Sequence, residues 1–261
     1  MKMDKEEQLL RRRLLDLAYT GYQRGICVFS DFLNLNEQNI FHGMKNDLPP
    51  IPYFTDGGFP DAERKMICFY GEEAYTYEQE LSSQINFPMN CIRIEPRNKK
   101  FSDSLTHRDF LGAILNLGID RSKIGDLLIE ENEGYLFSSH SVSEYITENL
   151  IKIKHTMVNA SIIDRKDFHY EPKLKEITGT VSSVRLDSIL SVAFRSSRSS
   201  LTGLIEGGKV FVNGKEVLSN SYPLKENDIV SVRGYGRFIY VGTSYQTKKG
   251  RYSVKILRYI S

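Results

Sequence analysis

The spacing of apolar residues predicts mixed helices and strands in the first part of the chain. Leucines recur at helical spacing over residues 5–24, which predicts an amphipathic helix. A second helix is predicted over 29–43, with Ser30 as its N-cap. Residues 46–60 collect prolines and glycines and are predicted to form a loop, and the apolar run 65–70 predicts a buried strand. This part is α+β and carries no chemical motif.

The next stretch predicts a β-α-β-β-α-β order. The predicted elements are strands at 91–96, 124–129, 133–138 and 158–164, a helix that begins at Thr106 with Asp109 as its capping-box partner, and a helix over 142–154. This order describes a ferredoxin-like sandwich, which RNA-recognition modules share with many other domains. Tyr135 and Phe137 alternate on one strand, as stacking aromatics would, but the glycine and basic residues typical of such a strand are missing.

A polar segment at 171–180 is predicted to be a linker to a last domain. Beyond it, apolar residues at helical spacing predict a helix over 184–194. Ser197 is a suitable N-cap for a second helix that begins at Arg198. Asn213–Gly214 is the strongest short signal for a β-hairpin. The predicted organisation is therefore three domains: an N-terminal α+β domain at 1–85, a ferredoxin-like domain at 86–171 and a helix–helix–hairpin domain at 180–261.

Charge separates the last domain from the rest. Residues 172–261 hold 15 Lys and Arg against 6 Asp and Glu, whereas residues 1–171 hold 20 against 27. Two interpretations of this basic end are possible: its residues bind a polyanion such as RNA, or they only solvate a small domain. Its presence on an otherwise acidic chain favours the first interpretation. No apolar run is long enough to span a bilayer, and the N-terminus does not resemble a secretion signal. Three widely spaced cysteines are expected to be reduced and buried, which fits a cytoplasmic protein.

The basic residues of the last domain fall where a phosphate could be held. A helix N-terminus favours an anion through its free amides and its dipole, and guanidinium groups add bidentate contacts. The candidate RNA-binding residues from this pattern are Arg185, Arg195, Ser197, Arg198, Lys209 and Lys215.

The same segment resembles the alpha-L RNA-binding domain, also called the S4 domain. The resemblance rests on RLD at 185–187, SR at 197–198, LIEGGKVFVNGK at 204–215 and LKENDIVSVRGYGRF at 224–238. It implies RNA contacts at Arg185, Ser197, Arg198, Lys209, Asn213 and Lys215.

Most of the chain resembles one family of S4-domain proteins, the YlmH proteins. The resemblance is carried by THRDFLGAILNLGIDRSKIGDLLI at 106–129 and VRGYGRF at 232–238. It implies a cytoplasmic RNA-binding protein that binds rRNA and tRNA on large ribosomal subunits still holding peptidyl-tRNA, in rescue of stalled translation. It implies no small-molecule cofactor.

Enzymatic alternatives have little support in the sequence. RLD at 185–187 resembles a catalytic loop of pseudouridine synthases, but the helical period runs through it, so Asp187 is predicted to be a first-turn helix residue. The chain contains no G-x-G-x-x-G and no metal-binding histidine spacing. The surviving alternative is an RNA-modifying or tRNA-cleaving enzyme around His107, Arg108 and Asp109. Whether these three line an open pocket decides between the two hypotheses.

Overall fold

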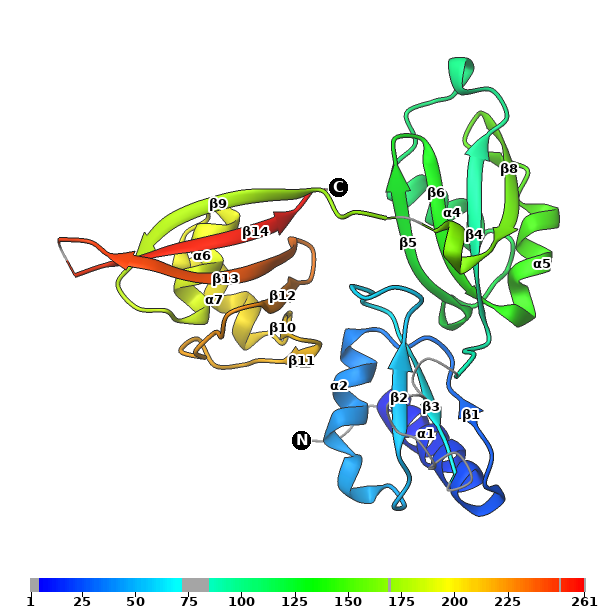
Figure 1. Cartoon of the computed structure of the whole chain (residues 1–261), viewed down its shortest axis with the longest axis horizontal. Coiled ribbons are helices and arrows are strands. Elements are labelled where there is room, and N and C mark those ends of the chain that lie inside the picture. The colour runs from blue at the N-terminus through cyan, green and yellow to red at the C-terminus, as the bar shows by residue number, and fades with distance from the viewer. Residues whose placement is uncertain (1–4, 72–84, 169, 249, 261) are drawn as a thin grey trace. The chain divides into compact units, whose positions relative to one another are not determined.

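A computed structural model describes residues 5–71, 85–168, 170–248 and 250–260 (Figure 1). The chain forms two compact units, one ending at residue 169 and the other beginning at 170. Both units combine helices with antiparallel sheets, so the predicted α+β class is confirmed.

The first part of the first unit packs helices against a three-stranded sheet of order β1-β3-β2. Its elements are α1 (Lys5–Arg24), β1 (Val28–Phe29), α2 (Leu35–Gly43), the short 3-10 helix η1 (Lys45–Asp47), β2 (Tyr53–Asp56) and β3 (Met66–Phe69). Leu14 of α1, Phe41 of α2 and Phe69 of β3 are fully buried and form the centre of this core. The predicted helix over 5–24 is confirmed.

The second helix begins later than its predicted range of 29–43. Asn34 is the N-cap, and a capping box joins its side chain to the amide of Glu37 while the Glu37 carboxylate accepts from the Asn34 amide. The Ser30 hydroxyl accepts instead from the Ile67 amide at 2.9 Å, which holds Ser30 beside β3. Ser30 is therefore not the cap, because its hydroxyl serves the sheet.

Two segments predicted to be loop or linker contain strands. Within 46–60, β2 pairs along its length with β3, starting at Tyr53. The segment 171–180 was expected to be a linker, but it contributes most of β9 (Leu174–Val181). Ile177 and Val181, four residues apart on the same face of the strand, are buried in the core of the second unit. The polar residues between them led to the wrong prediction.

The second part of the first unit has the predicted β-α-β-β-α-β order. Its elements are β4 (Met89–Pro96), η3 (Lys99–Phe101), α4 (His107–Leu115), η4 (Arg121–Lys123), β5 (Ile124–Glu130), β6 (Glu133–Ser139), α5 (His140–Asn149), β7 (Lys152–Ile153), β8 (Thr156–Ile163) and η5 (Arg165–Asp167). The strand order β5-β6-β4-β8-β7 is that of a ferredoxin-like sheet with one short added strand. The helix predicted over 142–154 ends at Asn149, because the next residues pair with β8.

Both faces of this ferredoxin-like sheet are covered. Ile92 of β4 and Leu136 of β6 pack under α4 and α5 in one core. Cys91 and Phe137, their neighbours on the same strands, point the other way and share a second core with residues of the N-terminal part, among them Phe32. The predicted division of this unit into domains 1–85 and 86–171 stays a prediction, since the two sheets are separate but have a common core.

Partly buried polar groups also join the two parts of the first unit. The Asp126 carboxylate of β5 accepts from the amides of Glu63 and Arg64 at 2.6 and 3.2 Å. The Arg64 guanidinium donates to the carbonyls of Phe32, Arg121 and Ile124. The amides of Glu63 and Arg64 and the carbonyls of Arg121 and Ile124 thus gain partners across the junction, which fixes the N-terminal part on the sheet.

The second unit places two helices on one face of a sheet of order β11-β10-β12-β13-β14-β9 (Figure 1). In addition to β9 its elements are α6 (Leu186–Phe194), α7 (Arg198–Glu206), β10 (Val210–Val212), β11 (Lys215–Glu216), β12 (Asp228–Val232), β13 (Gly236–Gln246) and β14 (Tyr252–Tyr259). Leu190 of α6, Ile205 of α7 and Ile256 of β14 are fully buried between the two layers. The predicted helices and hairpin are confirmed, but the unit begins with β9 rather than after it.

The cysteines differ in their exposure. Cys68 and Cys91 are buried as expected, whereas Cys27 is exposed. Burial raises the pKa of the Cys91 thiol to about 12. Cys91 therefore stays protonated and unreactive at neutral pH.

Candidate nucleic-acid interface

The predicted RNA-binding residues all lie in the second unit, on α6, α7 and the β10–β11 hairpin. Arg185 is the N-cap of α6, and Arg195 ends α6 in the left-handed conformation. Ser197 caps α7 as predicted, and its hydroxyl accepts from the Ser200 amide. Arg198 is the first residue of α7, and its side chain lies outside the part of the chain that the structure describes.

The described cationic side chains among them reach solvent. Arg185 is 46% exposed and lies 3.4 Å from the Asp187 carboxylate. Arg195, Lys209 and Lys215 are also exposed. A surface ion pair of this kind contributes little to stability, so Arg185 keeps most of its capacity to bind an external anion.

Helix α6 separates Arg185 from Arg195. At about 1.5 Å per residue, Arg185 and Arg195, which flank this helix, lie about 15 Å apart along its axis, farther than adjacent phosphates on one strand. The two guanidinium groups are therefore suited to contact different phosphates of one RNA.

The backbone amides at the start of α6 already donate to carbonyls of the same chain. The Leu186 amide donates to the Tyr222 carbonyl at 3.0 Å, and the Asp187 amide donates to the Asn220 carbonyl at 3.2 Å. The Asp187 carboxylate accepts from both the amide and the hydroxyl of Ser188. Asp187 is thus the first-turn helix residue that was predicted, and anion binding at this end depends on the Arg185 side chain.

Asn213 has a structural role in the hairpin turn. It adopts φ 50° and Gly214 adopts φ 77°, the left-handed pair that a two-residue hairpin turn requires. Its side chain donates to the Asp228 carboxylate at 2.8 Å and accepts from the Ile229 amide at 2.9 Å. These bonds occupy both ends of the amide, so the RNA contact implied for Asn213 stays a prediction, without a structural reason to support it.

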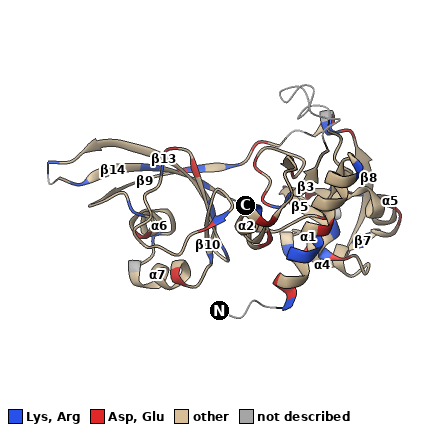
Figure 2. Ribbon diagram, turned by 90° about the horizontal axis from the view of Figure 1, so that it is seen from below, with Lys and Arg blue, Asp and Glu red and all other residues tan. Residues whose placement is uncertain are grey.

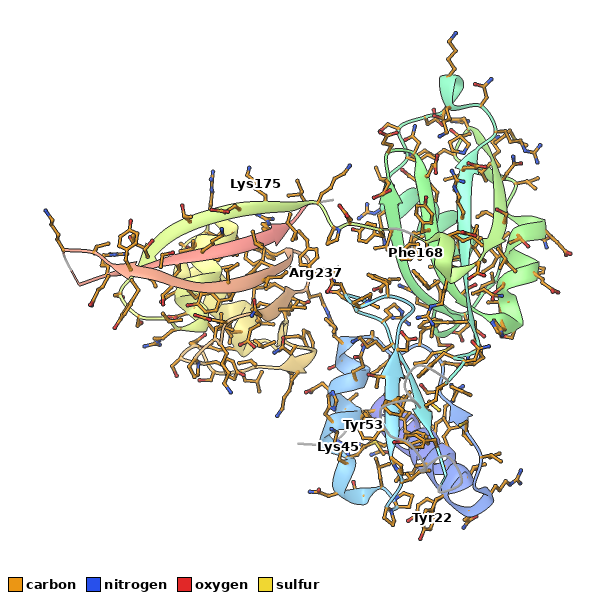
Figure 3. The ribbon with its side chains drawn as sticks, viewed as in Figure 1. Tyr22, Lys45, Tyr53, Phe168, Lys175 and Arg237 are labelled. Atoms are coloured by element: carbon orange, nitrogen blue, oxygen red, sulfur yellow. The ribbon has the colours of Figure 1, made fainter. Side chains whose placement is uncertain are left out.

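The predicted set missed two arginines of the C-terminal strands that lie over aromatic rings. The Arg258 guanidinium lies 4.8 Å over the Phe194 ring and donates to the carbonyls of Ala193 and Tyr235. Arg237, labelled in Figure 3, lies 4.0 Å over the Tyr259 ring. The VRGYGRF segment is the sequence signal that could have identified this region, because it places arginines around a tyrosine in a turn.

The ferredoxin-like domain does not offer the face that an RNA-recognition motif uses. Phe137 is fully buried, with ring centroids 5.4 Å from Phe59 and 5.1 Å from Phe168, the latter labelled in Figure 3. Gly58 lies so close that a Cβ there would be 2.2 Å from the Phe137 ring. Stacking of RNA bases on this strand would require the covering loop to leave.

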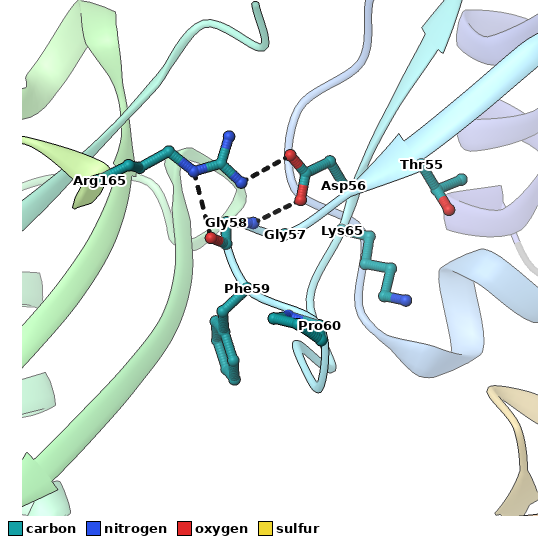
Figure 4. A pocket seen from close by; sticks show the side chains of 8 residues that line it. All are labelled: Thr55, Asp56, Gly57, Gly58, Phe59, Pro60, Lys65 and Arg165. Atoms are coloured by element: carbon teal, nitrogen blue, oxygen red, sulfur yellow. Dashed lines mark hydrogen bonds and ion pairs between the residues drawn. The ribbon is translucent and has the colours of Figure 1, made fainter. Parts of the chain in front are cut away.

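Arg165 fixes the loop that covers Phe137 by hydrogen bonds. Arg165 donates to the Gly58 carbonyl at 3.2 Å and to the Asp56 carboxylate at 2.8 Å, and the Gly58 amide donates to the same carboxylate (Figure 4). These groups line a hollow of about 320 Å³. The bonds satisfy the loop's own polar groups and hold Phe59 against the sheet.

The residues of the enzymatic alternative are not assembled into one site. Arg108 and Asp109 line an open hollow of about 480 Å³ between α4 and β7, but His107 does not. The Asp109 carboxylate is held by Lys154 at 2.8 Å and by the amide and hydroxyl of Thr106. Partial burial, and then the Arg121 guanidinium, lower the pKa of His107. Asp109 is therefore a capping and ion-pairing residue.

The described residues contain no group of three or more His, Cys, Asp and Glu side chains that could hold a metal ion. None of the helices they form is both long and apolar enough to cross a membrane.

Two known families match this chain, one in the ferredoxin-like part and one in the second unit. The S4 domain family matches residues 184–230, and a family described as a putative RNA-binding domain in YlmH matches residues 83–167. Together with the fold, these matches define an S4-domain RNA-binding protein. The chain is 30% identical over 233 residues to "Ribosome-associated protein quality control protein P2" of Bacillus subtilis (strain 168), covering 88% of this chain and 86% of that protein. The chain belongs to the YlmH family.

A solved structure supports the fold. It is titled "Cell division protein ylmH from Streptococcus pneumoniae", and it matches with a TM-score of 0.50 and 16% sequence identity over 64% of this chain and 96% of that one. At this identity the likeness concerns the fold alone.

Proposed function

We propose that this protein binds structured rRNA and tRNA in the cytoplasm, without catalysing a reaction, on large ribosomal subunits that carry peptidyl-tRNA after translation has stalled. The observation that carries the proposal is the S4-type arrangement of α6, α7 and the β10–β11 hairpin, with exposed cations at both ends of α6. The printed name of the Bacillus subtilis relative, which refers to ribosome-associated quality control, supports the ribosomal part.

Electrostatics supports the choice of partner. The basic second unit and the acidic first part of the chain favour binding in which the S4 domain is the part that contacts RNA. Guanidinium and ammonium groups on a preformed helical surface are the usual means of binding folded RNA through its phosphates.

Co-sedimentation tests this proposal directly. Full-length protein is mixed with purified large subunits carrying peptidyl-tRNA, with empty large subunits, and with small subunits as the control. We expect the strongest binding to the first, weaker binding to the second, and little to the third. Equal binding to all three would overturn the large-subunit proposal.

The salt dependence of the same binding tests its electrostatic origin. Five to seven phosphate contacts give a slope of roughly −4 to −6 in a plot of log affinity against log salt concentration. A flat response would show that the basic surface is not the contact.

A further inference from the structure

We propose that the tip of the β13–β14 hairpin, residues 245–248 and 250–252, is a second RNA contact, in which Tyr252 stacks on an unpaired base while Lys248 and Arg251 bind the adjacent phosphates. This inference rests on the proposed function and extends it to a surface outside both segments that match known families, 83–167 and 184–230.

The end of the chain has the composition of an RNA-binding surface. Residues 229–261 contain seven Lys and Arg, five Tyr and no Asp or Glu, so the six acidic residues of the basic region all precede residue 229. In Figure 2 basic segments mark the tip of this hairpin. Interleaved cations and aromatic rings fit a strand of nucleotides, because cations meet phosphates and rings meet bases.

The hairpin extends past the strand beside it. Tyr252 of β14 pairs with Val181, the last residue of β9, and on its other side with Gln246 of β13. Beyond this pair of residues, the β13–β14 hairpin extends past the end of β9 (Figure 1). Tyr245 is 65% exposed and Tyr252 is 39% exposed. Large aromatic rings in contact with solvent at a strand end are available to a partner.

The tip has a defined turn. The Thr247 amide donates to the Arg251 carbonyl at 2.7 Å, and the Gly250 amide donates to the Thr247 carbonyl at 2.9 Å. The Gln246 side chain donates to the Gly250 carbonyl at 3.1 Å. A preformed turn reduces the conformational entropy that binding would otherwise cost.

Strand alternation places the two tyrosines on opposite faces. β14 pairs with β9 without a register shift, and Val254 and Ile256 lie in the core under the helices, so Tyr252 is on the helix side. Tyr245 pairs with Ser253 and faces the other side. Of the two tyrosines, therefore, Tyr252 shares a face with the S4 helices and Tyr245 does not.

The helix-side face joins the predicted RNA surface. The Arg251 guanidinium donates to the Thr180 carbonyl at 2.7 Å, which fixes it beside the end of β9. Arg185 at the start of α6 follows Val181 by four residues, a span of at most about 14 Å. One RNA can thus contact Arg185 through a phosphate and reach Tyr252 with a neighbouring unpaired base.

A fluorescent single-stranded RNA separates this contact from the S4 surface. The probe is an oligouridylate of about 12 nucleotides with one 2-aminopurine, whose emission falls when it stacks on an aromatic ring. Affinity is measured by anisotropy with full-length protein. We expect Tyr252→Ala to bind about tenfold more weakly and to lose the quenching, and Tyr252→Phe to keep both. Tyr245→Ala is the matched control on the opposite face and should behave as wild type, with melting temperatures unchanged in all three variants.

Each result decides the inference. Binding by Tyr252→Ala equal to wild type, an equal loss in Tyr245→Ala, or a wild-type protein that does not bind the oligomer would overturn it. Co-sedimentation with large subunits is run in parallel. A wild-type protein that sediments with large subunits but does not bind the oligomer refutes this inference alone. A wild-type protein that quenches the probe but does not sediment refutes the proposed function alone.

Discussion

The ring of Phe59 is stacked on the ring of Phe137, with centroids 5.4 Å apart and planes inclined by 29°. Phe59 comes from the loop after β2, and Phe137 comes from the central strand β6 of the ferredoxin-like sheet. This contact closes the sheet face on which an RNA-recognition motif stacks bases. The family match to a putative RNA-binding domain thus applies here to a domain whose aromatic face is filled by its own chain.

Removal of the Phe59 ring should destabilise the first unit without impairing RNA binding. Phe59→Ala loses its contacts with Phe137 and Phe168, and we expect the free energy of unfolding to fall by about 2 kcal/mol. Urea denaturation measures the change. Tyr145→Ala, which truncates an exposed ring on α5, is the control and should shift stability by less than about 0.5 kcal/mol. A clear loss of RNA affinity in Phe59→Ala, measured where the variant is fully folded, would show that this sheet face does take part in RNA binding.

The fold could be predicted from the sequence where local signals agreed with tertiary structure. The capping box of Thr106 and Asp109, the Ser197 cap and the Asn213–Gly214 turn are all short-range hydrogen-bond patterns, and each is present as expected. The errors arose where long-range pairing decided the outcome. β9 reads as a polar linker because its exposed face is polar, and its strand character comes from β14, more than 70 residues later.

The position of β9 predicts where the chain can be cut. A fragment of residues 170–261 should unfold cooperatively and keep most of the RNA affinity, whereas residues 182–261, which lack β9, should not fold stably. β9 pairs with β14 at eight positions and buries Ile177 and Val181, a loss of about 4 kcal/mol or more from a small domain. Thermal melts followed by circular dichroism test the two fragments. Equal melting temperatures would show that β9 is dispensable.

Acid should weaken the start of α4 through Asp109. The hydrogen bond from Lys154, followed by those from Thr106, lowers the pKa of this carboxyl from 3.8 to about 2. A lowered pKa in the folded state adds stability above pH 3.8, and this stability is lost as the pH falls toward 2. Asp109→Asn should therefore melt below wild type at pH 7, with the difference shrinking between about pH 4 and pH 2. Glu148→Gln, which removes an exposed carboxylate of α5, is the control, and a difference that stays constant with pH in Asp109→Asn would contradict the assignment.

The candidate site was less predictable than the fold. Sequence pattern located the cations of α6, α7 and the hairpin, since each lies beside a helix cap or turn with a recognisable signature. Pattern did not show that the side-chain amide of Asn213 is hydrogen-bonded to Asp228 and Ile229. It also did not show that the first amides of α6 donate to carbonyls of a distant segment. These contacts join segments 15 or more residues apart, and no local rule specifies them.

The arginines at the two ends of α6 should contribute to RNA binding independently. Arg185→Ala and Arg195→Ala each remove a charge-assisted contact worth about 1.5–3 kcal/mol, so each should weaken binding to large subunits about tenfold or more. Because α6 holds the two residues about 15 Å apart, their free energies should add, and the double variant should lose about a hundredfold. Arg198→Ala, at the first position of α7, should give a loss similar to the single variants. Arg24→Ala, which removes an exposed cation at the end of α1, is the control for net charge. Co-sedimentation and melting temperature are measured on the same preparations: unchanged sedimentation would remove these arginines from the interface, and a large fall in melting temperature would mean that they stabilise the fold rather than bind RNA.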